Sequence, residues 1–160
     1  MRFPDDALRV VDPRYATRPS NTAFADGFPL LLATEESLWD LNRRLAQRGA
    51  QPVPMTRFRP NIVLAGANRP YAEDDWLVLR CGGQQLDLVK PCSRCVMITM
   101  DQQSGVIPEL GEPLSTLSQY RRWEGKVAFA QNVVVHGSGP LIIDSPVTVH
   151  SEGLRNRWKI

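Results

Sequence analysis

The sequence of 160 residues lacks the features that mark nucleic-acid-binding, membrane and secreted proteins. Its 19 basic and 17 acidic side chains are scattered, without a long run of one sign, so the net charge of +2 gives no footprint for nucleic acid. No apolar run approaches the length of a membrane span, and Asp5 and Asp6 stand where a secretion signal would carry its apolar stretch. We therefore expect a soluble, cytoplasmic protein that binds neither nucleic acid nor membranes.

Cysteine and histidine are scarce, which limits the metal sites that the chain could build. Three cysteines are an odd number, and in a reducing compartment such residues are more often thiols, ligands or nucleophiles than disulfide partners. Cys92 and Cys95 have C-x-x-C spacing, which leaves open a zinc site, a redox dithiol, or one special cysteine beside an incidental one. A closed zinc site needs further ligands, and only Cys81, His136 and His150 remain. The plainest alternative is that these thiols are small buried apolar groups.

Hydrophobic patterning predicts one domain that is mainly β, with one or two helices. The more secure helix follows Thr34, a suitable N-cap, and stops at Gly49, with acidic residues in its first turn and arginines near its end. A short second helix is expected over 114–122. Short strands separated by turn residues favour a barrel or sandwich over a βαβ sheet. These strands are expected over 29–33, 57–65, 76–80, 85–89, 95–100, 127–135 and 141–149.

Three regions of the chain differ in composition. Residues 1–28 contain several prolines and little periodicity, so we expect an extended lead-in that belongs to the domain. The β-barrel itself is expected over 29–150. Residues 151–160 are polar and basic and are expected to form a loosely attached tail.

The neighbours of Cys95 make it the best candidate for chemistry. Arg94 precedes it directly, Lys90 lies just upstream, and the segment 57–61 (R-F-R-P-N) is expected to open a buried strand. Cations stabilise a thiolate, and a thiolate binds soft metals. Arginine forks and the amide of Asn61 also suit a phosphate or the edge of a pterin, although a solvated charge at a strand end is the plainer interpretation of either arginine. A redox dithiol is disfavoured because the residues after Cys95 predict a strand rather than a helix.

The sequence resembles the MOSC domain from about residue 11 to residue 149. Within that family it resembles the branch that contains bacterial reductases of N-hydroxylated compounds and the mitochondrial amidoxime reducing component. R-F-R-P-N followed at this distance by C-S-R-C is the specific part of the match. The segments that carry it are Phe28–Leu32, Glu35–Leu38, Asp40–Asn42, Arg57–Val63, Glu73–Trp76, Cys92–Cys95 with Thr99, Asp101 and Gly105, Glu112–Leu114 with Leu117, Tyr120 and Arg121, and Phe129 with Gln131.

The resemblance implies a MOSC-type β-barrel that holds molybdenum cofactor (molybdopterin), in which one protein thiolate binds the metal. Cys95 would be that ligand and the catalytic residue. The residues matched to contacts with the pterin, its phosphate or the nearby backbone are Arg59, Asn61, Ser93, Arg94, Gly27 and Phe28. The implied activity is two-electron reduction of a small N-hydroxylated substrate, with electrons from a ferredoxin- or flavin-type donor protein. The alternatives are a non-catalytic carrier of the cofactor or of sulfur, and persulfide-based sulfur transfer at Cys95.

The chain also departs from that branch. Its members begin with another β-rich domain that supplies basic residues to the cofactor, and some append a ferredoxin domain with four cysteines. The chain starts after the first of these, so we expect a stand-alone remnant, a fragment of a larger protein, or half of a site that another subunit or such a domain in trans completes. Asn132 stands where the family has an aromatic residue. Asp101 and His136 are expected to be turn and loop residues and are left outside the site.

Overall fold

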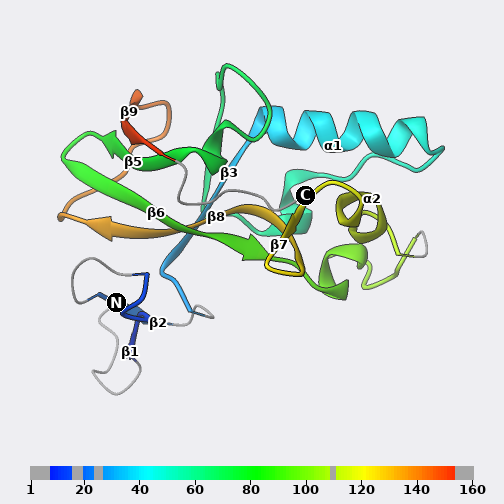
Figure 1. Cartoon of the computed structure of the whole chain (residues 1–160), viewed down its shortest axis with the longest axis horizontal. Coiled ribbons are helices and arrows are strands. Elements are labelled where there is room, and N and C mark those ends of the chain that lie inside the picture. Colours follow the sequence, from blue (N-terminus) through cyan, green and yellow to red (C-terminus); the bar gives the residue numbers. More distant parts are fainter. Residues whose placement is uncertain (1–7, 16–19, 24–26, 109–110, 154–160) are drawn as a thin grey trace.

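The computed structural model describes residues 8–15, 20–23, 27–108 and 111–153 (Figure 1). Its main feature is a curled seven-stranded sheet with the order β4-β3-β8-β6-β5-β9, in which β7 pairs with β8 outside this path. The expectation of a mainly β domain of barrel type is therefore confirmed. The strands are β3 (Leu30–Thr34), β4 (Ile62–Leu64), β5 (Trp76–Cys81), β6 (Gln84–Ser93), β7 (Arg122–Trp123), β8 (Lys126–His136) and β9 (Val147–Glu152).

The described residues also form two α-helices, α1 (Glu35–Gln47) and α2 (Leu114–Ser118). α1 begins as predicted, because the hydroxyl of Thr34 accepts a hydrogen bond from the backbone N–H of Ser37 at 3.3 Å. It ends just before Gly49, whose φ of 75° suits a residue without a Cβ. Leu41 and Leu45 lie on its buried face and belong to the core under the sheet. No helix among the described ranges combines the length and the apolar character needed to cross a membrane.

Two connections set the sheet topology. β3, α1 and β4 form a βαβ unit whose strands run parallel, with Leu32 opposite Ile62. The barrel-type sheet thus contains one parallel crossover that the strand pattern did not predict. β5 and β6 form the predicted hairpin around the Gly82–Gly83 turn, with Cys81 opposite Gln84.

Three short 3-10 helices complete the described elements: η2 (Met55–Phe58), η3 (Ala72–Asp74) and η4 (Val96–Thr99). The strand expected over 95–100 is wrong, because η4 occupies most of that segment. There the hydroxyl of Thr99 donates to the carbonyl of Val96 at 2.6 Å, and Ile98 and Thr99 turn inward. The β propensity of this apolar segment gives way to tertiary packing.

Two further expectations need correction. The strand that follows R-F-R-P-N is not buried: β4 is a three-residue edge strand, and Val63 is 44% exposed. Residues 141–146 are not part of a strand, because β9 starts at Val147, directly after Pro146. β9 continues through Glu152, so the first two residues of the expected tail belong to the sheet. Residues 154–160 lie outside the described part, and the tail there stays a prediction.

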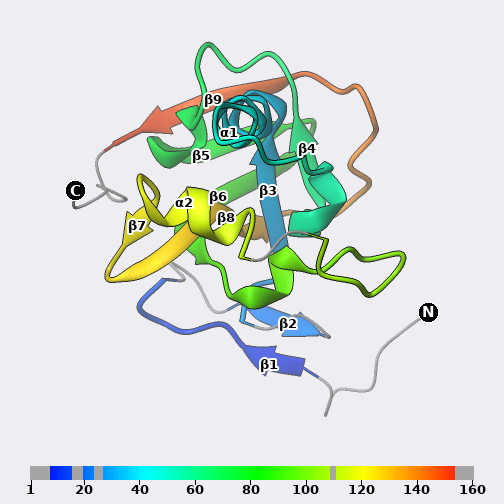
Figure 2. The same ribbon diagram turned by 90° about the vertical axis from the view of Figure 1, so that its right-hand side faces the viewer.

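The lead-in contains a two-stranded antiparallel sheet, in which β1 (Leu8–Val10) pairs with β2 (Asn21–Ala23). This pair and α1 lie on opposite sides of the main sheet, as Figure 2 shows. Val11 is buried against Val89 of β6 and Val134 of β8. The described residues of the lead-in therefore pack on the main sheet.

Candidate functional site

The C-terminal end of β6 carries the C-S-R-C motif. Cys92 and Ser93 are the last residues of β6, and the backbone N–H of Arg94 donates to the carbonyl of Val127 at 2.7 Å, beside β8. Cys95 has extended backbone angles and precedes η4. Its side chain is exposed, whereas Cys92 is half-buried. The motif therefore presents one thiol to solvent at the end of a strand.

Arg94 is the most constrained cation beside that thiol. Its Nε donates to the carbonyl of Phe129 at 2.9 Å and its Nη1 to the carbonyl of Phe58 at 3.1 Å. Its Nη2 is buried without a hydrogen-bond partner. Burial lowers the pKa of Arg94, while the nearby thiols of Cys92 and Cys95 act in the opposite direction. In the described part of the chain no carboxylate forms an ion pair with it, so this half-buried guanidinium lacks an anion.

Arg59 follows Phe58 directly, so the carbonyl that holds Arg94 lies next to a second arginine. Arg59 has a φ of 55°, which non-glycine residues adopt rarely, and its backbone N–H donates to the carbonyl of Thr56. Its side chain is exposed. η2 thus brings Arg59 beside Arg94, although 34 intervening residues of sequence separate the two.

Asn61 has a structural role that the sequence did not reveal. Its Oδ1 accepts a hydrogen bond from the backbone N–H of Leu31 at 2.8 Å, and its own N–H donates to the carbonyl of Leu31. These two bonds clamp the start of β4 to β3. Only the Nδ2 of this exposed side chain remains available to a ligand.

Two cations that the sequence placed in the neighbourhood of Cys95 are engaged elsewhere. Arg57 is buried, and it donates to the carbonyl of Thr99 at 3.0 Å and to the Asp101 carboxylate at 3.3 Å. It therefore braces η2 against η4. Lys90 lies over the rings of Tyr15 and Trp123, with its Nζ 4.7 and 5.3 Å from their centroids.

The remaining candidates lie as follows. The ring of Phe28 lies edge-on to the ring of Tyr15, with their centroids 5.9 Å apart. It packs on the cluster of Val11, Val89 and Val134. Gly27 beside it is exposed. Phe28 thus contacts the lead-in, the middle of β6 and β8.

The two residues left outside the site also have defined partners. Asp101 accepts bonds from Gln103 and Ser104 and forms a turn, as predicted. His136 is not a loop residue, because it ends β8 and its Nε2 lies 3.1 Å from Asp87.

The geometry narrows the interpretations of the cysteine pair. Cys92 lies within a strand, so the helix start that activates the first thiol of a redox dithiol is missing. Among the residues that the structure describes, no three His, Cys, Asp or Glu side chains gather to hold a metal ion. Cys95 could still bind a metal that brings its other donors with it. A thiol beside a guanidinium that lacks an anion fits an anionic group with a soft metal.

The sequence missed what holds Arg94 in place. The rings of Phe58 and Phe129 stack with centroids 4.1 Å apart, and this contact joins η2 to β8. Their carbonyls then converge on the Arg94 guanidinium. The only signal in the sequence was that both phenylalanines belong to the family-like segments. The sequence does not reveal which backbone carbonyls are left to accept hydrogen bonds from a side chain.

Comparison with known proteins gives consistent results. The profile of the MOSC domain matches residues 19–148. The chain is 40% identical over 116 residues to molybdenum cofactor sulfurase of Arabidopsis thaliana, which covers 69% of this chain and 14% of that protein. It is 40% identical over 133 residues to mitochondrial amidoxime-reducing component 1 of Homo sapiens, which covers 78% of this chain and 38% of that protein. A third relative, mitochondrial amidoxime reducing component 2 of Macaca fascicularis, is 40% identical over 114 residues, which cover 71% of this chain and 31% of that protein. The chain thus spans less than two fifths of the length of each of these relatives.

Proposed function

The chain belongs to the MOSC domain family, and from this we propose that it binds molybdenum cofactor at the end of β6, with the Cys95 thiolate as protein ligand of the metal. The observation that carries the proposal is the state of Arg94. A half-buried guanidinium whose buried Nη2 has no hydrogen-bond partner, and which has no carboxylate beside it, is costly unless an anion joins it. The phosphate of a pterin cofactor is such an anion, and the exposed thiol of Cys95 is the next side chain along the chain.

Each residue of the set has a distinct role in this proposal. Arg94, fixed by two carbonyls, donates from Nη2 to an anionic oxygen. Arg59 supplies a second positive charge from the exposed end of η2. Ser93 and the free Nδ2 of Asn61 offer neutral donors at the rim of the site. The family resemblance adds the backbone of Gly27 and Phe28, although the ring of Phe28 packs on the cluster of Val11, Val89 and Val134.

The proposed activity is two-electron reduction of a small N-hydroxylated substrate. The bound cofactor would supply the redox chemistry at its metal. The protein would present the exposed sulfur of Cys95 as the ligand, beside the positive charge of Arg94. Loss of the hydroxyl as water consumes two electrons and two protons, and the electrons come from a ferredoxin- or flavin-type donor protein. Because Cys95 is exposed, a small molecule can approach the metal without a rearrangement of the core.

The proposal is tested by the molybdenum and pterin content of protein purified from a host that makes the cofactor. We expect near-stoichiometric molybdenum in the wild type and in Cys92→Ser, and none in Cys95→Ser. Reduction of benzamidoxime with reduced methyl viologen as donor should follow the same order. Unchanged molybdenum in Cys95→Ser would refute the assignment of the ligand. Full molybdenum content without amidoxime reduction would support the assignment of the binding site but refute the proposed activity.

Similarity to molybdenum cofactor sulfurase, together with the exposed thiol, favours sulfur transfer as a second candidate. In that reaction the Cys95 thiolate attacks the outer sulfur of a donor persulfide, the S–S bond of the donor breaks, the donor cysteine leaves as a thiolate, and Cys95 carries the transferred sulfur as a persulfide. Intact-protein mass spectrometry after incubation with a persulfide-loaded cysteine desulfurase measures this step. One added sulfur atom on the wild type and on Cys92→Ser, and none on Cys95→Ser, would favour it. A carrier of the cofactor without turnover would show neither that addition nor amidoxime reduction.

A further inference from the structure

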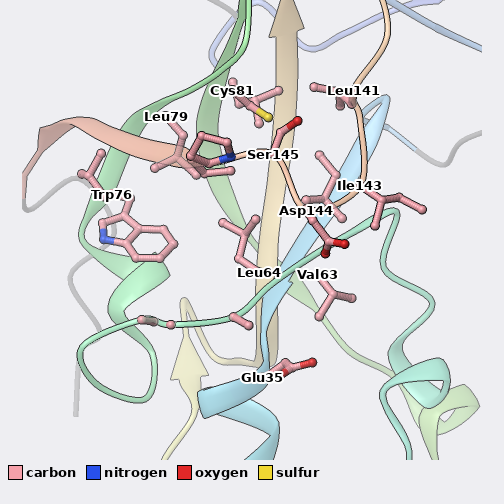
Figure 3. A pocket seen from close by; sticks show the side chains of 18 of the residues that line it. Glu35, Val63, Leu64, Trp76, Leu79, Cys81, Leu141, Ile143, Asp144 and Ser145 are labelled. Carbon is pink, nitrogen blue, oxygen red and sulfur yellow. The ribbon is translucent and has the colours of Figure 1, made fainter.

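A cleft of about 840 Å³ opens between β4 and β9, the two edge strands of the curled sheet. Its apolar lining includes Leu64 of β4, Trp76 and Leu79 of β5 and Leu86 of β6, and the segment 141–146 forms a further wall. Figure 3 shows Glu35 and Cys81 at opposite ends of the cleft, and Trp76 and Asp144 on opposite sides of it with Leu64 between them. The volume is within the range of cavities that enclose small molecules.

The cleft is separate from the thiol site. Leu86 and Ser93 both lie on β6, and seven residues of strand at about 3.3 Å each place them about 23 Å apart. Of the residues proposed to hold the cofactor, Asn61 alone also lines the cleft. Apart from Asn61, a ligand in the cleft would therefore contact residues that the proposed cofactor chemistry does not use.

The walls of the cleft leave apolar side chains in water. Ile143 is 89% exposed, Ile142 67%, Val63 44% and Val149 43%. Contiguous apolar surface of this kind is uncommon on an isolated protein and marks sites where something binds. Covering it gains about 25 cal/mol for each Å² removed from water.

The charged residues of the lining are all acidic: Glu35, Asp144 and Glu152. No lysine, arginine or histidine lines the cleft, and within the described ranges none of the three carboxylates forms an ion pair. Asp144 has a φ of 63°, a conformation that aspartate adopts more readily than most non-glycine residues.

We propose that this cleft binds a small apolar molecule that carries one positively charged nitrogen. The ring or chain of the ligand contacts Val63, Leu64 and Val149, and its ammonium group lies toward Asp144. Apolar contact supplies most of the affinity, and the carboxylates select the sign of the charge. The proposal does not depend on the cofactor and requires only the folded chain.

A matched series of three probes tests the charge preference: naphthylmethylammonium, the neutral naphthylmethanol and the anionic naphthoate. Isothermal titration calorimetry on the whole cofactor-free chain should give saturable binding of the cation. We expect the alcohol to bind up to about fivefold more weakly, because it loses an exposed ion pair, and the anion more weakly still. Equal affinities for the three probes, or no saturable binding of the cation, would overturn the proposal.

Variants locate the site and separate it from the thiol. Val63→Lys places a like charge on an exposed wall position and should abolish binding of the cation, whereas Val10→Lys, at the 72% exposed Val10 of β1, should not change it. Asp144→Asn keeps a side chain that tolerates positive φ and should reduce the preference for the cation. Cys95→Ser should bind as the wild type does. Wild-type affinity in Val63→Lys, or lost affinity in Cys95→Ser, would contradict a separate site in this cleft.

Discussion

Replacing Arg94 by lysine changes the hydrogen bonds at the proposed cofactor site while keeping the charge. The guanidinium bridges the carbonyls of Phe58 and Phe129 at 3.1 and 2.9 Å, and so ties η2 to β8. A single ammonium group cannot reproduce this planar fork, so at least one carbonyl loses its donor. A hydrogen bond to a charged group contributes about 1.5–3 kcal/mol. We therefore expect Arg94→Lys to lower the free energy of unfolding of the cofactor-free protein by about 2 kcal/mol.

Urea unfolding, followed by circular dichroism, measures this loss. Arg59→Lys is the matched control, because the Arg59 side chain is exposed and should tolerate the change within about 0.5 kcal/mol. In cofactor-loaded protein both variants should retain less molybdenum than the wild type, and Arg94→Lys should retain the less of the two. Equal unfolding free energies for the wild type and Arg94→Lys would show that the two carbonyl contacts do not hold the site together.

Three further predictions concern the core and the helix end. Burial raises the pKa of Glu73. The contribution of its protonated form to the free energy of unfolding is therefore full at acid pH and is lost as pH rises through that raised pKa. Glu73→Gln should remove this pH dependence of the free energy of unfolding, measured by urea unfolding at several pH values. Asp74→Asn leaves the buried Arg121 without its bidentate partner at 2.6 and 3.0 Å, and should cost about 3–5 kcal/mol in urea unfolding. Gly49→Ala forces a Cβ into a φ of 75° and should lower the thermal midpoint, with a loss of about 1 kcal/mol.

Local signals in the sequence were enough for the elements whose ends are fixed by their own residues. Thr34 and Gly49 mark the two ends of α1, because an N-cap hydrogen bond and a positive φ each act within one turn of the chain. The Gly82–Gly83 turn predicted the hairpin of β5 and β6 for the same reason. The family-like motifs identified Cys95 and Arg94 as candidates before any contact between distant segments was known.

Tertiary structure decided the outcome where distant segments compete for the same residues. The apolar run after Cys95 becomes η4 because Ile98 and Thr99 turn toward the core, and β4 becomes an edge strand because it pairs only with β3 among the described strands.

The same holds for the cations around the thiol. From composition alone, Arg57, Lys90 and Arg94 all contribute positive charge near Cys95, and only the family resemblance singles out Arg94. In the fold Arg57 pairs with Asp101 and Lys90 lies over aromatic rings, whereas Arg94 keeps one buried nitrogen without a hydrogen-bond partner. By itself the sequence determined which residue types could do chemistry. Only the packing of η2 against β8 decided which cation lacks an anion among the described residues, because the two carbonyls that hold Arg94 belong to residues far apart in the chain.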